Sequence, residues 1–165
     1  MSTVLFIDFE AFQHGDEDFQ IKELCILDAD SPLKPLTFMF QPSTPWDMLS
    51  SDRRRTYAYQ EHHLHHLAWN EGDIRYCTKC IFHHIQSAFP LVAGVSTVCY
   101  VLGSQKTSFL QRELPMLNSY QYDNAFAYKD LPMAPLHLTC TYRNHSRNHC
   151  AVLKCYQLFT HLESL

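Results

Sequence analysis

The sequence predicts an α/β fold in which helices flank a mixed five-stranded sheet. Three runs rich in β-branched and aromatic residues lie in the first 42 residues, and helical spacing of apolar residues begins only after them. The chain has 165 residues, of which 46% are hydrophobic and 18% are charged, and this composition is sufficient for one buried core. We therefore expect a single domain over residues 1–165.

The beginning of the chain is expected to form an antiparallel meander. Strand-like composition covers residues 3–12 (TVLFIDFEAF), 19–29 and 35–42, and short clusters of Gly, Asp and Pro separate the three runs. Brief turns of this kind join neighbouring antiparallel strands. The His- and Trp-containing segment 57–73 is expected to be an irregular connection.

The remainder of the chain alternates helices with buried strands. Apolar spacing and composition predict helices over 76–89, 106–114 and 149–165, and strands over 94–104 and 124–131. The order of elements is then β-β-β-α-β-α-β-α. A meander that continues into parallel strands joined by helices is the plan of RNase H-like domains.

Composition also bears on compartment and partners. The net charge of −4 argues against binding of nucleic acid by bulk charge alone. The first apolar run has no basic leader, and no stretch approaches the roughly 18 apolar residues of a bilayer span, so we expect neither a secretion signal nor membrane contact. Seven cysteines in such a chain favour metal binding or burial over disulfides. The expected compartment is the cytoplasm or the nucleus.

The sharpest local signal is the pair Asp8 and Glu10 inside the first predicted strand. Residues two apart on a strand point to the same face, so both carboxylates converge there. They repel one another unless a divalent cation or a proton lies between them. The alternative is a strand with one solvated acidic face.

The segment VLFIDFEAF resembles the first motif of DEDD-type 3′–5′ exonucleases, in which this Asp and Glu hold catalytic magnesium ions. By the same resemblance to the DEDDh exonuclease pattern, His149 occupies the position of the general base and Lys154 that of a metal-binding aspartate. The segment 103–114 (GSQKTSFLQREL) matches the second motif but offers no aspartate. The catalytic set Asp8, Glu10 and His149 is therefore incomplete, and if Asp8 and Glu10 still bind a metal, one Mg²⁺ rather than two is expected there.

A second constellation is a C-x4-H-x4-C spacing formed by Cys140, His145 and Cys150. Thiolate and imidazole are the ligands that tetrahedral zinc prefers, and a fourth ligand must come from elsewhere. One alternative adds His137, three residues before Cys140. Another uses the Cys77-x-x-Cys80 pair with His83 or His84 on one helix face, against the simpler interpretation of buried cysteines.

The chain also resembles the Maelstrom family of the piRNA pathway, which has a DEDD exonuclease fold and a Glu-Cys-His-Cys zinc site. The likeness covers IKELCI, FMFQP, VCYVLGSQKTSFL and CAVLKC. It implies Zn²⁺ held by Glu23, Cys140, His145 and Cys150. It further implies binding of single-stranded RNA, a role in RNA silencing, and an RNA cleavage that does not use the DEDD carboxylates. Members with this zinc site generally lose the two acids that remain here at positions 8 and 10.

Local basic groups are the candidates for contact with nucleic acid, and they are Arg53, Arg54, Arg55, Arg143 and Arg147. The histidines at positions 62, 63, 65 and 66, with Tyr57, Tyr59 and Trp69, are candidates for stacking on bases. More often, such residues cover a connection between a sheet and a helix.

Three functions follow as hypotheses. The first is a zinc-stabilised, catalytically degenerate domain that binds single-stranded RNA. The second is an active Mg²⁺-dependent DEDDh-type 3′–5′ exonuclease that recruits a further acid, such as Asp123 or Asp130, and as an enzyme it would be a nuclease of the ribonuclease class. The third is a non-enzymatic scaffold that binds RNA-silencing proteins.

Overall fold

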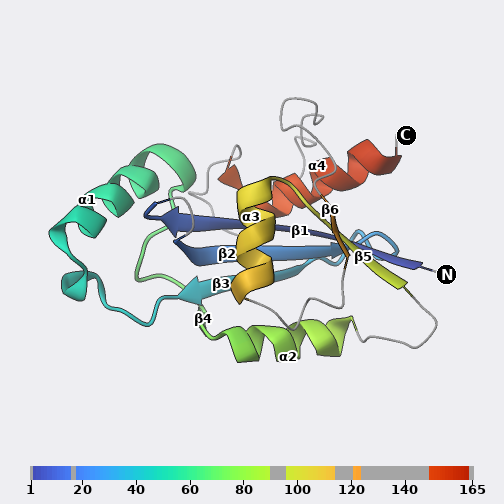
Figure 1. Cartoon of the computed structure of the whole chain (residues 1–165), viewed down its shortest axis with the longest axis horizontal. Coiled ribbons are helices and arrows are strands. Elements are labelled where there is room, and N and C mark those ends of the chain that lie inside the picture. Colours follow the sequence, from blue (N-terminus) through green and yellow to red (C-terminus); the bar gives the residue numbers. More distant parts are fainter. Residues whose placement is uncertain (1, 16–17, 90–95, 114–120, 124–148, 164–165) are drawn as a thin grey trace.

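A computed structural model describes residues 2–15, 18–89, 96–113, 121–123 and 149–163 of the chain (Figure 1). Within these residues, a mixed sheet has the strand order β4-β3-β2-β1-β5-β6. Its strands are β1 (Ser2–Gln13), β2 (Phe19–Asp28), β3 (Leu36–Gln41), β4 (Ile74–Arg75), β5 (Ser96–Val101) and β6 (Gln121–Asp123).

The sheet confirms the predicted meander and its parallel continuation. β1 pairs antiparallel with β2, and β2 pairs antiparallel with β3. β5 runs parallel to β1, and β6 runs parallel to β5. The two-residue β4 is added at the edge, parallel to β3. The strand predicted over 124–131 lies outside the described residues, directly after β6.

The helices are α1 (Ser51–Gln60), α2 (Thr78–Ala88), α3 (Ser104–Glu113) and α4 (Ala151–Glu163), with one-turn segments η1 (Trp46–Met48) and η2 (Glu61–His65). The expectation of an irregular connection over 57–73 was wrong in its first part, since α1 and η2 occupy residues 51–65. Ser50 caps α1, because its hydroxyl accepts a hydrogen bond from Arg53 N at 3.2 Å. Only Tyr57 of this helix is buried, so apolar spacing carried little signal.

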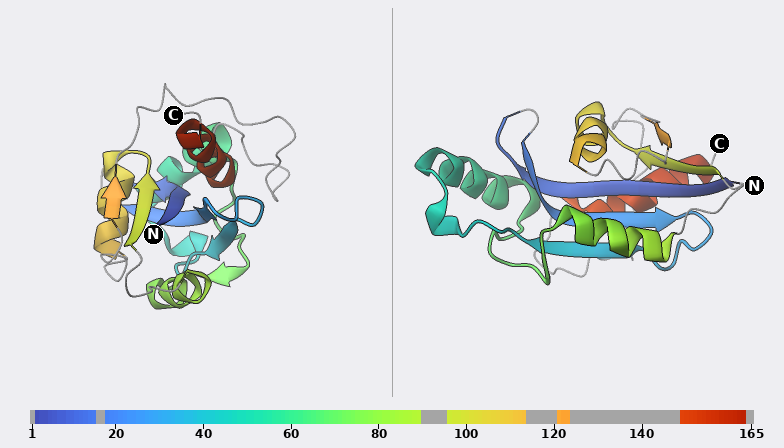
Figure 2. Two further views of the ribbon diagram at one scale, coloured as in Figure 1. Left: turned by 90° about the vertical axis from the view of Figure 1, so that its right-hand side faces the viewer. Right: turned by 60° about the horizontal axis from the view of Figure 1, so that its bottom comes forward.

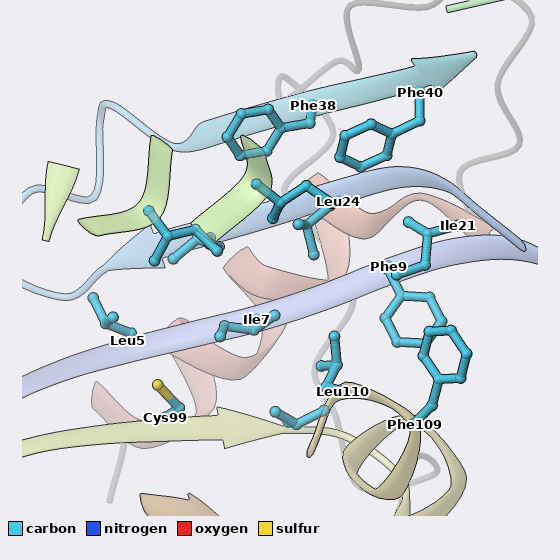
Figure 3. Close-up of a cluster of buried hydrophobic side chains, with 14 residues drawn as sticks. Leu5, Ile7, Phe9, Ile21, Leu24, Phe38, Phe40, Cys99, Phe109 and Leu110 are labelled. Carbon is cyan, nitrogen blue, oxygen red and sulfur yellow. The ribbon is translucent and has the colours of Figure 1, made fainter. Parts of the chain in front are cut away.

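Side chains of β1 alternate between two faces of the sheet. Leu5, Ile7 and Phe9 point to the face covered by α2 and α3, where Phe109 and Leu110 of α3 meet them (Figure 3). Cys25, Leu27 and Leu153 are among the residues that pack with Phe6 on the opposite face. Figure 2 shows α4 on this second face and α2 on the first. Asp8 and Glu10 therefore lie on the face of α4.

A β-bulge between Glu10 and Ala11 leaves Lys22 of β2 without a partner across the pair. The Lys22 side chain is fully buried, and its ammonium group donates to Phe40 O at 2.7 Å, to Trp69 O at 3.0 Å and to Glu71 O. These hydrogen bonds hold the segment that contains Trp69 and Glu71 against β3.

None of the helices in the described part of the chain has the length and apolar run that a bilayer span requires.

Candidate functional site

Three buried carboxylates gather on the α4 face of the sheet. Asp8 is 0% exposed, Glu10 is 7% exposed and Glu23 of β2 is 2% exposed. The antiparallel register sets Glu10 directly opposite Glu23, and Asp8 opposite Cys25. Carboxylates buried this closely require compensating positive charge or hydrogen bonds. Each of the three has such a partner.

Lys106 of α3 is the partner of Asp8. Its Nζ lies 2.8 Å from Asp8 Oδ1 and donates to Phe9 O at 2.7 Å. Ile7 pairs with Val101 at the end of β5, so the parallel register brings the start of α3 to the level of Asp8. Burial acts to lower the pKa of Lys106, but the Asp8 and Glu10 carboxylates and the hydrogen bond to Asp8 outweigh it and raise that pKa. Lys106 therefore stays an ammonium ion.

Glu10 is flanked by two basic side chains from the start of α4. Lys154 Nζ lies 3.5 Å from Glu10 Oε1, and His149 Nδ1 lies 4.0 Å from Glu10 Oε2. Lys154 is 8% exposed as a residue, so this ion pair is largely shielded from solvent. The structure thus brings together the predicted residues Asp8, Glu10 and His149, with a lysine ammonium beside each carboxylate.

Glu23 interacts with the N-terminus of α4. Its Oε1 accepts a hydrogen bond from Ala151 N at 2.6 Å, across 128 positions of sequence. A carboxylate at this place satisfies a free helical N–H and interacts favourably with the helix dipole. Cys150, the preceding residue, is fully buried. Of the predicted zinc set, Glu23 therefore contacts the backbone of the residue directly after Cys150. Cys140 and His145 lie outside the described residues.

The residues present do not fit a two-magnesium centre. Such a centre needs several carboxylates around the pair of ions, and here Asp8 and Glu10 each face a lysine. Among the described residues, no group of three or more His, Cys, Asp or Glu side chains is placed to hold a metal, and this includes the alternative set at Cys77 and Cys80. Asp8 Oδ2 is buried and, within the described residues, accepts no hydrogen bond.

The arginines predicted to contact nucleic acid differ in their exposure to solvent and in their ion pairs. Arg53 Nη1 lies 2.8 Å from Asp18 Oδ2 and donates to the Tyr57 hydroxyl at 2.9 Å, and these two hydrogen bonds raise the pKa of Arg53. Arg54 is half-buried and Arg55 is exposed. Arg143 and Arg147 lie outside the described residues.

The aromatic residues proposed for base stacking divide into two groups. Tyr57 and Trp69 are buried and stack on one another, with ring centroids 5.1 Å apart, so their use as a stacking platform was a wrong expectation. Tyr59 is 60% exposed and its ring centroid lies 4.5 Å from that of His63. Arg55, Tyr59 and His63 recur every four residues along α1 and η2 and are all exposed. We call these three residues the α1 stripe.

A pocket of about 330 Å³ lies beside α1. Its lining includes Asp18, Thr44, Ser50 and Arg53, together with parts of Tyr57 and Trp69. Polar donors and acceptors dominate this lining.

Sequence reasoning missed Lys106. The interpretation of segment 103–114 rested on its missing aspartate, and Lys106 had no role in it. A lysine five residues beyond the end of a buried strand, in a chain with two buried acids, was the available signal, because a carboxylate is buried only with a partner.

Comparison with solved structures shows an exonuclease fold. E. coli exonuclease I in complex with a dT13 oligonucleotide superposes with a TM-score of 0.53 at 15% identity, over 99% of this chain and 41% of that one. A structure of exonuclease I described in terms of processivity gives 0.52 at 15% identity, over 98% and 40%. The complex of the E. coli enzyme with a 5cy-dA13 oligonucleotide gives 0.50 at 13% identity, over 98% and 39%.

This chain thus spans about 40% of the length of the structures it matches. No protein-family model and no curated protein sequence matches it. The likeness confirms the predicted fold, a mixed sheet flanked by helices as in RNase H-like exonucleases. The resemblance to the Maelstrom family and its zinc set stays a prediction.

Proposed function

We propose that this chain is a catalytically degenerate exonuclease-fold domain that binds single-stranded nucleic acid without two-metal hydrolysis. The observation that carries the proposal is the pairing of Asp8 with Lys106 and of Glu10 with Lys154. The two ammonium groups supply the positive charge that magnesium ions would bring to an active exonuclease.

Electrostatic repulsion from the two lysines opposes the binding of Mg²⁺ to Asp8 and Glu10. At an effective dielectric constant of about 20, two unit charges 4 Å apart interact by about 4 kcal/mol, and a divalent cation doubles that figure. A Mg²⁺ at Asp8 would therefore meet strong repulsion from Lys106 unless the lysine moved away. Movement of Lys106 would break its hydrogen bonds to both Asp8 and Phe9.

Single-stranded nucleic acid is the ligand that the surface supports best. Two of the similar structures are complexes with single-stranded oligonucleotides. The α1 stripe combines a cation with exposed aromatic rings, which is the composition of sequence-tolerant single-strand sites. The net charge of −4 requires that such contact be local. The preference for RNA, and RNA-silencing proteins as partners in the cytoplasm or nucleus, rest on the resemblance to the Maelstrom family.

A structural zinc ion is the second part of the proposal. Glu23, Cys140, His145 and Cys150 would hold it, and the hydrogen bond of Glu23 to Ala151 N, directly after Cys150, supports this set. Zinc there would tie the segment before α4 to β2. Its removal by a chelator would then loosen the domain.

The test is binding and hydrolysis measured on one substrate. A 5′-labelled single-stranded RNA of about 20 nucleotides is titrated with the full chain, first without added Mg²⁺ and then with millimolar Mg²⁺. We expect salt-dependent binding in both conditions and no release of nucleotides. The variant Arg55→Ala should weaken binding, whereas Lys34→Ala, an exposed lysine outside α1, should not.

A second candidate, an active exonuclease, is favoured by the buried Asp8 Oδ2, which accepts no hydrogen bond among the described residues. Release of nucleotides that requires Mg²⁺ and disappears in Asp8→Ala would establish that candidate and overturn the proposal. No RNA binding even at low salt would leave the scaffold function in its place.

A further inference from the structure

We propose that Cys77 and Cys80 form a redox-active dithiol, a site at which a small disulfide oxidises the chain reversibly. The two residues form a Cys-x-x-Cys pair that begins α2, directly after β4. Cys77 is the N-cap of α2, with extended backbone angles (φ −157°, ψ 117°), and Cys80 lies in the first turn. This site lies on α2, apart from the carboxylates on the face of α4.

Accessibility separates this pair from the other described cysteines. Cys80 is exposed and Cys77 is partly exposed, and the remaining four described cysteines are fully buried. Burial raises the pKa of Cys99 to about 12 and also raises that of Cys155. Buried thiols with raised pKa values are inert toward oxidants. Among the described residues, an oxidant in solution therefore reaches only Cys77 and Cys80.

The two thiols of the pair are chemically unequal. Interaction with the Cys80 thiol lowers the pKa of Cys77, and the backbone N–H groups of Cys80 and Lys79 and the charge of Lys79 act in the same direction. The same interaction with Cys77 raises the pKa of Cys80. A helix N-terminus stabilises a thiolate at its first position. Cys77 is thus suited to attack, and Cys80 to resolve the product.

The spacing also suits a reversible link rather than a structural one. Residues three apart at a helix start lie on the same side, within the separation that a disulfide bridges. Only two residues lie between the cysteines, so the closed loop is short and the link restricts the unfolded chain little. The described fold holds both thiols in reduced form.

The oxidation balances with a low-molecular-weight disulfide such as glutathione disulfide. The Cys77 thiolate attacks one sulfur of that disulfide, whose S–S bond breaks and releases one thiolate, which takes up a proton. Cys80 then loses its proton and attacks Cys77 Sγ in the mixed disulfide, and the second small thiol leaves. Two protein thiols are oxidised by two electrons, and the small disulfide is reduced to two thiols.

The experiment equilibrates the full chain in buffers with graded ratios of reduced to oxidised glutathione. Acid quenching, alkylation with a mass-tagged maleimide and peptide mass spectrometry then locate each link. We expect a single intrachain Cys77–Cys80 disulfide that appears in one two-electron transition and reverses with excess thiol. Absence of this link, or a link from either residue to another cysteine, overturns the proposal.

Two single variants test the assignment of roles. Cys80→Ser should accumulate a stable glutathione adduct on Cys77. Cys77→Ser should form its adduct at least tenfold more slowly near pH 7. The rate of alkylation by iodoacetamide should rise at lower pH in Cys80→Ser than in Cys77→Ser. Equal rates and equal pH profiles would overturn the assignment even if both variants fold normally.

Discussion

The ammonium group of Lys106 lies 2.8 Å from the carboxylate of Asp8, although 98 positions of sequence separate the two residues. The contact joins α3 to the central strand of the sheet, at the strand segment that resembles the first motif of DEDD exonucleases. It makes a buried acid a stable part of the fold without any cation from solution. Substitution of Lys106 should therefore lower the free energy of unfolding, whatever its effect on activity.

Lys106→Met should destabilise the chain by about 3 kcal/mol at neutral pH, because it leaves the Asp8 carboxylate buried without its charged partner. The measurement is urea unfolding followed by circular dichroism. Lys34→Met, at an exposed position, is the matched control and should change stability by less than about 0.5 kcal/mol. Equal effects of the two substitutions would mean that the ion pair contributes nothing.

Lys22 should make stability depend on pH. Burial lowers the pKa of Lys22 to about 8, against smaller opposing effects of Glu71 and Glu61. Because the folded chain releases this proton before the unfolded chain does, the cost of burying the charge is present in full below pH 8. It is relieved as the pH rises toward 10.5. Between pH 7 and pH 9.5, the stability of the parent relative to Lys22→Met should rise by about 2 kcal/mol. A flat difference would contradict the low pKa.

Gly72 should tolerate no side chain. A Cβ at this position would lie 2.4 Å from the carbonyl carbon of Phe40, where the connection after α1 approaches β3. Gly72→Ala is expected to destabilise the chain by about 2 kcal/mol or more, measured by thermal unfolding. Gly15→Ala is the control, since its φ is also positive but no atom of the described residues lies within 4 Å of its Cβ. The control should cost about 1 kcal/mol from backbone strain alone.

Two substitutions of Glu23 should distinguish its role as a cap of α4 from its proposed role as a zinc ligand. Glu23→Gln keeps an oxygen that accepts from Ala151 N, whereas Glu23→Ala removes it. We expect Glu23→Ala to cost about 1 to 2 kcal/mol more than Glu23→Gln in metal-free protein. If zinc is also held there, elemental analysis should find it reduced in both variants and in Cys140→Ser. Full zinc content in all three would end the proposed ligand set.

Part of the fold and of the carboxylate site could be predicted from the sequence, as particular residues show. The alternation of Leu5, Ile7 and Phe9 with Asp8 and Glu10 fixes which face of β1 holds the acids, because side chains on a strand alternate strictly. The parallel pairing of β1 with β5 brings Lys106 beside Asp8, and no local sequence pattern encodes that long-range register. Helix α1 was missed for a related reason, since Tyr57 is its only buried residue and its Ser50 cap leaves no apolar spacing in the sequence.

The proposed zinc ligands could be predicted from the sequence only in part. Its spacing was evident from Cys140, His145 and Cys150, but the fourth ligand depended on a resemblance. The structure brings Glu23 to the start of α4 by the register between β1 and β2 and by the docking of α4 on them. Cys140 and His145 lie outside the described residues, so the complete set stays a prediction.

The most direct test of the central claim is the response of the folded chain to Mg²⁺. If Lys106 and Lys154 occupy the place of the metal ions, millimolar Mg²⁺ should leave the melting temperature of the parent unchanged. In Lys106→Met with Lys154→Asp, it should raise the melting temperature by several degrees, since a ligand that binds only the folded chain stabilises it. A Mg²⁺-dependent rise in the parent that Asp8→Asn abolishes would contradict the account.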